Sequence, residues 1–139
     1  MNLGLDFVFE RLGTTRVVIA RNYDCPIPDV LRSLSVEPNA DALFEVSADR
    51  AADCLTALLW KDLAYSCEMM PEARAEAYAK QFIAQFPHDS TRFFTNGEWE
   101  RYHEVTAFSY TPVTKATFSA VVMVVSPDYA VGVVIEDED

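Results

Sequence analysis

The most constraining feature of this sequence is a pair of nearly continuous apolar runs close to its C-terminal end. The runs cover residues 118–125 and 129–135, and Ser126-Pro127-Asp128 separates them. Unbroken runs of Val and Ile are typical of strands buried on both faces, whereas half-exposed strands alternate. Proline suits a type I turn between the runs. The sequence therefore predicts a β-hairpin at the centre of a sheet, covered on both sides, with Gly132 at a bulge or a close backbone approach.

Two amphipathic helices are predicted before this hairpin. Ser47 is a suitable N-cap for a helix that continues to about Cys67, and its apolar residues recur at helical spacing. Pro71 suits the first turn of a second helix, which Pro87 ends. We expect the core to form where the helices pack on the hairpin, through Leu55, Leu59, Leu63, Phe82, Ile83 and Phe86.

Shorter extended segments complete the predicted sheet. Residues 16–20 fit a strand after a polar turn, residues 42–46 fit a short strand, and residues 3–12 fit a strand better than a helix. Asn96-Gly97 is typical of a type I′ turn, because both residues tolerate positive φ. We therefore expect a hairpin there, followed by a long, mostly polar strand over residues 98–110 with one face in water.

Together these patterns predict one α+β domain over residues 1–139, with a mostly antiparallel sheet and two main helices packed on one face. Hydrophobic residues make up 50% of the chain and charged residues 24%, which excludes an intrinsically disordered protein. A chain of 139 residues is long enough to bury a core without disulfides or metals.

The charge balance limits the kinds of partner. The chain has 22 acidic and 11 basic residues, a net charge of −11 and an isoelectric point near 4.5. A phosphate backbone requires a basic footprint, so neither nucleic acid nor an anionic membrane surface is an expected partner. The acidity favours a basic protein partner, or it keeps the protein soluble. Since no apolar stretch is long enough for a membrane span and no basic leader opens the sequence, we expect a cytoplasmic protein.

No motif in the sequence predicts catalysis. Cys25, Cys54 and Cys67 are widely spaced, without a Cys-x-x-Cys pair, and are expected to be buried thiols. His88-Asp89-Ser90 contains the residue types of a hydrolase triad, but three consecutive side chains cannot align as one. The usual phosphate-loop, dinucleotide, nucleophile-elbow and zinc-protease motifs are missing. We therefore expect no enzymatic activity, no bound metal and no cofactor.

An acidic, partly aromatic surface is the predicted binding site for a basic protein. No basic residue follows Lys115, and the chain ends in four carboxylates placed directly after a buried strand. Exposed Tyr and Trp often anchor protein interfaces, and acidic residues around them suit a basic partner, whereas packing in the core is the alternative for each ring. Neutralising the terminal carboxylates is expected to slow association without unfolding the chain. The alternative is that the acidic terminus only prevents aggregation of the apolar hairpin. The predicted binding residues are Glu98, Trp99, Glu100, Tyr102, Glu136, Asp137, Glu138 and Asp139.

Residues 93–97, 117–122 and 134–139 resemble segments of small acidic immunity proteins, which are partners of secreted bacterial toxins of the polymorphic and contact-dependent kinds. The resemblance lies in a helical first half, a sheet-rich second half and a strand that ends in an acidic terminus. It implies a cytosolic inhibitor that occupies or blocks a toxin domain, and it assigns no individual binding residue. A small acidic secretion chaperone and a DNA-mimic inhibitor are the alternatives, and the oligomeric state stays open.

Overall fold

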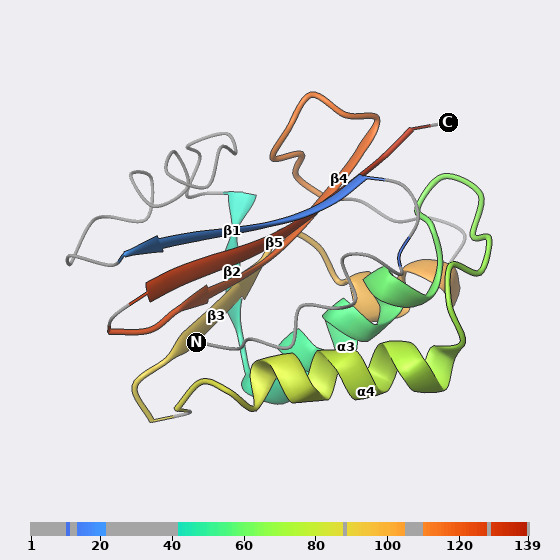
Figure 1. The fold of residues 1–139 in the computed structure, drawn as a ribbon. Helices are drawn as coiled ribbons and strands as arrows, with labels where there is room; N and C mark the ends of the chain where they lie inside the picture. The colour runs from blue at the N-terminus through green and yellow to red at the C-terminus, as the bar shows by residue number, and fades with distance from the viewer. Residues whose placement is uncertain are drawn as a thin grey trace.

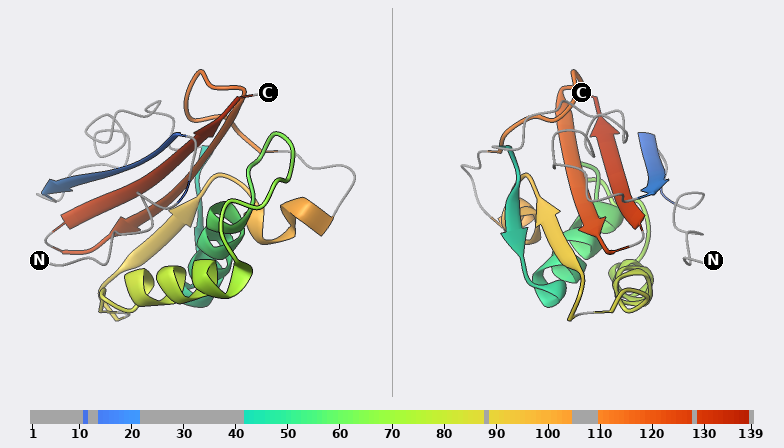
Figure 2. Two further views of the ribbon diagram at one scale, coloured as in Figure 1. Left: turned by 45° about the vertical axis from the view of Figure 1, so that its right-hand side comes forward. Right: turned by 90° about the vertical axis from the view of Figure 1, so that its left-hand side faces the viewer.

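The computed structural model describes residues 11, 14–21, 42–87, 89–104, 110–127 and 129–138. These residues form the predicted α+β fold, with an antiparallel sheet of strand order β1-β5-β4-β3-β2. Helices α3 and α4 lie on the same side of that sheet (Figures 1 and 2). The elements are β1 (Thr14–Arg21), β2 (Phe44–Val46), α3 (Ala48–Trp60), α4 (Glu72–Ile83), β3 (Arg92–Thr95), the 3-10 helix η2 (Trp99–Glu104), β4 (Phe118–Val125) and β5 (Tyr129–Asp137).

The predicted apolar hairpin is confirmed as β4 and β5. Its pairing runs without a break from Phe118 opposite Asp137 to Val125 opposite Ala130. Gly132 pairs with Met123 on one side and Val18 on the other in regular register, so the expected bulge is wrong. β4 occupies the middle of the sheet, and residues 119–124 are buried, as a strand covered on both faces requires.

The two sides of the sheet are packed unequally. Val122 and Val124 of β4 join a large cluster with α3 and α4, whereas Val121 and Met123 join a smaller cluster on the other side. Burial of each large side chain stabilises the fold by about 1.5–3 kcal/mol. The large cluster contains all six predicted core residues, which confirms the expectation for Leu55, Leu59, Leu63, Phe82, Ile83 and Phe86.

Helix α3 starts where the sequence predicts and ends earlier. The Ser47 hydroxyl accepts a hydrogen bond from the backbone N–H of Arg50 at 3.2 Å, which confirms the N-cap. The helix stops at Trp60 instead of about Cys67, because Lys61 is extended. α4 follows Pro71 as predicted but ends at Ile83, ahead of the proline expected to end it.

The predicted hairpin at Asn96-Gly97 is wrong. β3 pairs with β2 and β4, and residues 99–104 form η2 rather than the first part of the expected polar strand; residues 105–109 of that strand lie outside the described residues. The Asn96 side chain is buried and fully engaged, which fixes this segment by tertiary contacts instead of turn geometry. Its amide donates to the carbonyls of Thr111 and Ser119, and its oxygen accepts from the Trp99 indole and the Val121 backbone. A Cβ at position 97 would lie 3.0 Å from the Trp99 ring and 3.1 Å from the Cβ of Tyr110, so a larger residue would fit only if these neighbours moved by a few tenths of an ångström.

Smaller expectations have mixed outcomes. β1 and β2 confirm the strands predicted over residues 16–20 and 42–46. Cys54 is buried as expected, but Cys67 is exposed. Cys25, His88 and the strand expected within residues 3–12 lie outside the described residues, apart from Arg11.

Candidate partner-binding surface

Two of the four glutamates predicted at the binding surface, Glu98 and Glu100, lie just before and within the first turn of η2. Glu98 is exposed, and its carboxylate lies 3.7 Å from both Arg50 and Arg101. Glu100 is half-buried, pairs with Arg50 at 3.1 Å and accepts a hydrogen bond from the Cys54 thiol at 2.6 Å. Burial, reinforced by Glu100, raises the pKa of the Cys54 thiol far above its ordinary value. Cys54 is therefore an inert thiol that holds η2 on α3, and Glu100 serves the fold.

The two predicted aromatic contacts are internal. Trp99 is fully buried, and its indole packs on the ring of Tyr110 with centroids 4.9 Å apart. Its predicted contact with a partner is wrong, and the alternative of core packing is confirmed; Asn96 satisfies its only polar atom inside the protein. Tyr102 is half-buried and donates a hydrogen bond to the carbonyl of Leu63 at 2.5 Å. Tyr102 thus supports the segment between α3 and α4.

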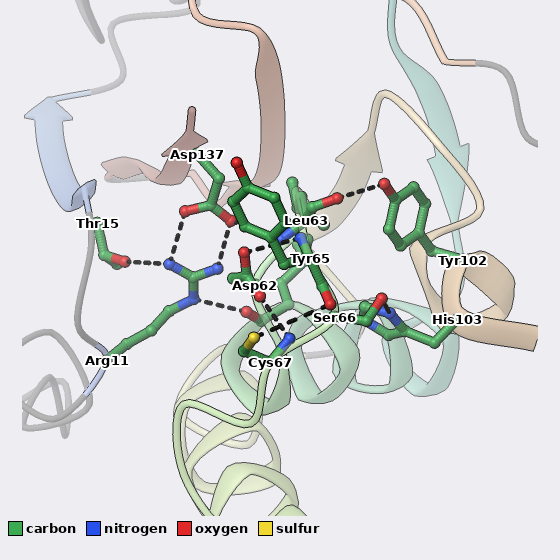
Figure 3. Close-up of polar contacts among 11 residues, drawn as sticks. Arg11, Thr15, Asp62, Leu63, Tyr65, Ser66, Cys67, Tyr102, His103 and Asp137 are labelled. Carbon is green, nitrogen blue, oxygen red and sulfur yellow. Dashed lines mark hydrogen bonds and ion pairs between the residues drawn. The ribbon is translucent and has the colours of Figure 1, made fainter. Parts of the chain in front are cut away.

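The C-terminal carboxylates do not form one exposed cluster. Glu136 is half-buried and Glu138 is exposed, whereas Asp139 lies outside the described residues. Asp137 is buried, and the expectation that it faces a partner is wrong. The Arg11 guanidinium donates a hydrogen bond to each Asp137 carboxylate oxygen, at 3.2 and 2.7 Å. The backbone N–H of Leu63 donates to the same carboxylate at 2.9 Å (Figure 3).

This buried ion pair joins distant parts of the chain. The Arg11 Nε also donates to the carbonyl of Leu58 in α3 at 2.7 Å. Since three donors surround the Asp137 carboxylate, it is a compensated buried charge and not an accessible one. Neutralising it together with Glu136 and Glu138 would therefore disturb the fold as well as the surface charge.

The α3–α4 loop (residues 61–71) is a feature that sequence reasoning missed. The Asp62 carboxylate accepts backbone hydrogen bonds from Tyr65 at 3.0 Å and from Cys67 at 2.5 Å. Ser66 adopts a φ of 54°, in the left-handed region that residues other than glycine rarely occupy. The main chain of Asp62 also donates to the carbonyl of Cys67 at 3.0 Å. These bonds give the backbone an alternative to the helix and explain why α3 stops at Trp60.

The loop borders a shallow hollow beside the end of β5. We call it the loop hollow; its volume is about 440 Å³. Tyr65 projects at its rim with 67% of its surface exposed. The lining consists of Asp62, Tyr65, Cys67, Met69, Glu136, Asp137 and Glu138.

A second hollow, the acidic groove, lies between α3, α4 and η2 and has a volume of about 330 Å³. Three of its carboxylates, Asp53, Glu72 and Glu104, form no ion pair with any described residue. The other two carboxylates of the groove form ion pairs, Glu100 with Arg50 and Glu76 with Lys80. The lining consists of Asp53, Thr56, Ala57, Trp60, Glu72, Glu76, Glu100, His103 and Glu104.

Trp60 and His103 form the aromatic wall of the acidic groove. Their ring centroids are 6.1 Å apart, and the Lys61 ammonium lies 4.1 Å from the Trp60 ring. Burial, together with the Lys61 charge, lowers the pKa of His103, so the ring is neutral at pH 7. His103 Nδ1 lies 3.0 Å from the Ser66 hydroxyl, so His103 links the groove to the α3–α4 loop. Trp60 Nε1 and His103 Nε2 are buried and have no hydrogen-bond partner among the described residues.

Only part of the predicted site is therefore accessible to a partner protein. Of its seven described residues, Glu98, Glu136 and Glu138 keep carboxylates at or near the surface, and the last two line the loop hollow. The groove carboxylates were not predicted, because the sequence pattern of a polar helix face is the same whether that face meets solvent or another helix. Glu72 and Glu76 are four residues apart and therefore share a helix face, but such an acidic pair is ordinarily interpreted as a solvated face.

The described residues contain no group of three or more His, Cys, Asp or Glu that could hold a metal ion. They also contain no helix with the length and apolar character of a membrane span. No protein family, curated protein or solved structure matches this chain.

Proposed function

We propose that this protein acts in the cytoplasm as an inhibitor that binds a basic partner protein and blocks its active domain, as an immunity protein does for a toxin. It acts by binding and not by catalysis. The observation that carries the proposal is the acidic groove, where Asp53, Glu72 and Glu104 stand without ion-pair partners among the described residues.

The electrostatics favour a basic protein as the ligand. A net charge of −11 attracts a basic partner at long range. The groove concentrates uncompensated carboxylates beside the indole of Trp60, whose ring already receives the Lys61 ammonium at 4.1 Å. Carboxylates and an aromatic face are both suited to Lys or Arg side chains of a partner. Charge complementarity of this kind raises association rates and specificity.

The position of the groove also favours binding of a folded domain. Its walls come from α3, α4 and η2, and α3 and η2 are joined by the partly buried hydrogen bond from Cys54 to Glu100 at 2.6 Å. A preformed surface binds with little ordering cost, which favours tight recognition of a rigid target.

Co-expression with the product of the gene immediately upstream tests the proposal. We expect that product to be a basic protein that arrests growth when expressed alone, and this chain to restore growth and form a stable complex with the folded domain. The complex should be measured by calorimetry with purified proteins, using the folded domain and its denatured form in parallel. Absence of both protection and complex would refute the proposal, and binding of the denatured form alone would favour a secretion chaperone.

A further inference from the structure

Tyr65 stands out among the described aromatic residues. Large hydrophobic side chains are mostly buried here, and those described as exposed are Phe44 at 38% and Tyr65 at 67%. Phe44 belongs to strand β2 and lies under the guanidinium of Arg50, 6.0 Å from its ring. Tyr65 instead projects from the α3–α4 loop beside the loop hollow (Figure 3). Exposed Tyr side chains are frequent anchors of protein interfaces because they combine large contact area with few rotatable bonds.

Hydrogen bonds in three places fix the loop that carries Tyr65. Inside the loop, the Asp62 carboxylate binds two backbone N–H groups. On one side, Leu63 donates its N–H to Asp137 of β5 and accepts the Tyr102 hydroxyl through its carbonyl. On the other side, Ser66 contacts His103 of η2 at 3.0 Å. Tyr65 is therefore displayed on a preorganised backbone, which reduces the entropy lost when a partner binds.

The surroundings of Tyr65 specify the charge of that partner. Glu136 and Glu138 line the same hollow, and no described residue that lines it is Lys or Arg. The one described arginine that reaches this region, Arg11, is fully buried against Asp137 and presents no charge to solvent. A basic surface with a recess for an aromatic ring complements this arrangement.

We propose that Tyr65 is the anchor of the partner interface, inserting into a recess on the basic protein while Glu136 and Glu138 face its Lys and Arg side chains. This inference rests on the proposed function and specifies its contact residue. It also explains the strained φ of 54° at Ser66, because that conformation shapes the loop next to the anchor.

The test uses the purified upstream-gene product as the probe and the full chain in three forms. Tyr65→Ala should weaken binding by about 30-fold or more, chiefly through faster dissociation, as for an interface hot spot. Tyr65→Phe, which keeps the ring, should bind within about threefold of the unchanged chain, because the ring supplies most of the contact area. Phe44→Ala is the matched control and should have no effect, since it removes an exposed ring on another element.

A second pair of variants separates preorganisation from contact. Asp62→Ala keeps the Tyr65 side chain but removes both acceptors for the loop backbone, so backbone order parameters for residues 63–67 should fall from about 0.85 to below about 0.6. Binding should then weaken by roughly tenfold, since the loop must be ordered again on association. Asp62→Asn keeps one acceptor oxygen without the charge and should restore part of the affinity.

The outcomes distinguish the two proposals. If the unchanged chain binds and Tyr65→Ala binds equally well, Tyr65 is not the anchor and the proposed function stands. If Asp62→Ala mobilises the loop without weakening binding, preorganisation of the loop is refuted. If the unchanged chain does not bind the upstream-gene product, the proposed function and this inference both fail.

Discussion

The end of β5 and the acidic groove both contain carboxylates, but in opposite environments. Asp137 is buried among three donors, two of them from Arg11, whereas Asp53, Glu72 and Glu104 line an open groove without an ion-pair partner among the described residues. In the sequence, the C-terminal run looks like the exposed acidic surface and the helical carboxylates look ordinary. The comparison shows that hydrogen-bond donors and burial, not position in an acidic run, decide whether a carboxylate stabilises the fold or is available to bind a partner.

The largest effect should come from removing the buried carboxylate. Asp137→Ala leaves the Arg11 charge and the Leu63 N–H without their acceptor, which should lower the free energy of unfolding by about 3–5 kcal/mol. Chemical denaturation measures the loss. The control is the adjacent Glu138→Ala, which removes an exposed carboxylate that accepts two solvent-exposed hydrogen bonds from Thr117, and it should cost about 1 kcal/mol or less. Equal losses in the two variants would show that the ion pair contributes nothing specific.

The same contrast between buried and exposed positions should hold for aromatic rings. Phe82→Ala empties a fully buried site in the large core cluster and should cost about 3–5 kcal/mol in denaturation experiments. Phe44→Ala, at an exposed ring of an edge strand, should cost less than about 1 kcal/mol. A loss below about 1 kcal/mol for Phe82→Ala would contradict its place in the core.

A smaller effect, on binding kinetics, should come from neutralising the groove. The triple variant Asp53→Asn, Glu72→Gln and Glu104→Gln should fold normally and associate with the basic partner about tenfold more slowly at low salt. The difference should shrink as salt screens the charges, which stopped-flow measurements at several ionic strengths would detect. Glu45→Gln is the control, because Arg92 already compensates that exposed carboxylate at 2.9 Å. Identical association rates and salt dependence for the triple variant would place the interface away from the groove.

The smallest effect concerns pH. Burial lowers the pKa of His103 below its ordinary 6.5, so the folded chain binds this proton less readily than the unfolded chain does. The resulting stability is complete above pH 6.5 and is lost as the pH falls through that value toward the lowered pKa. Unfolding curves between pH 7 and 5 should therefore show a shallower loss of stability for His103→Gln than for the unchanged chain. Parallel pH profiles would mean that His103 has the same pKa in both states.

Patterns within short stretches of sequence predicted the fold well. The apolar runs of β4 and β5, the helical spacing in α3 and α4 and the Ser47 cap depend on neighbours a few residues apart, so the sequence alone determined them. The α+β class and the six core residues named from the sequence followed from those elements. The net charge of −11 is equally a property of the sequence.

Tertiary structure decided the features on which a binding site depends. Arg11 meets Asp137 across 126 residues, and Asn96 forms four hydrogen bonds to residues of η2, β4 and the segment before β4. Such contacts turned a predicted hairpin into a 3-10 helix and an expected surface tryptophan into a core residue. The physical reason is that periodicity reports which face of one element is apolar, whereas the burial of a polar group depends on donors and acceptors that the fold brings from elsewhere in the chain.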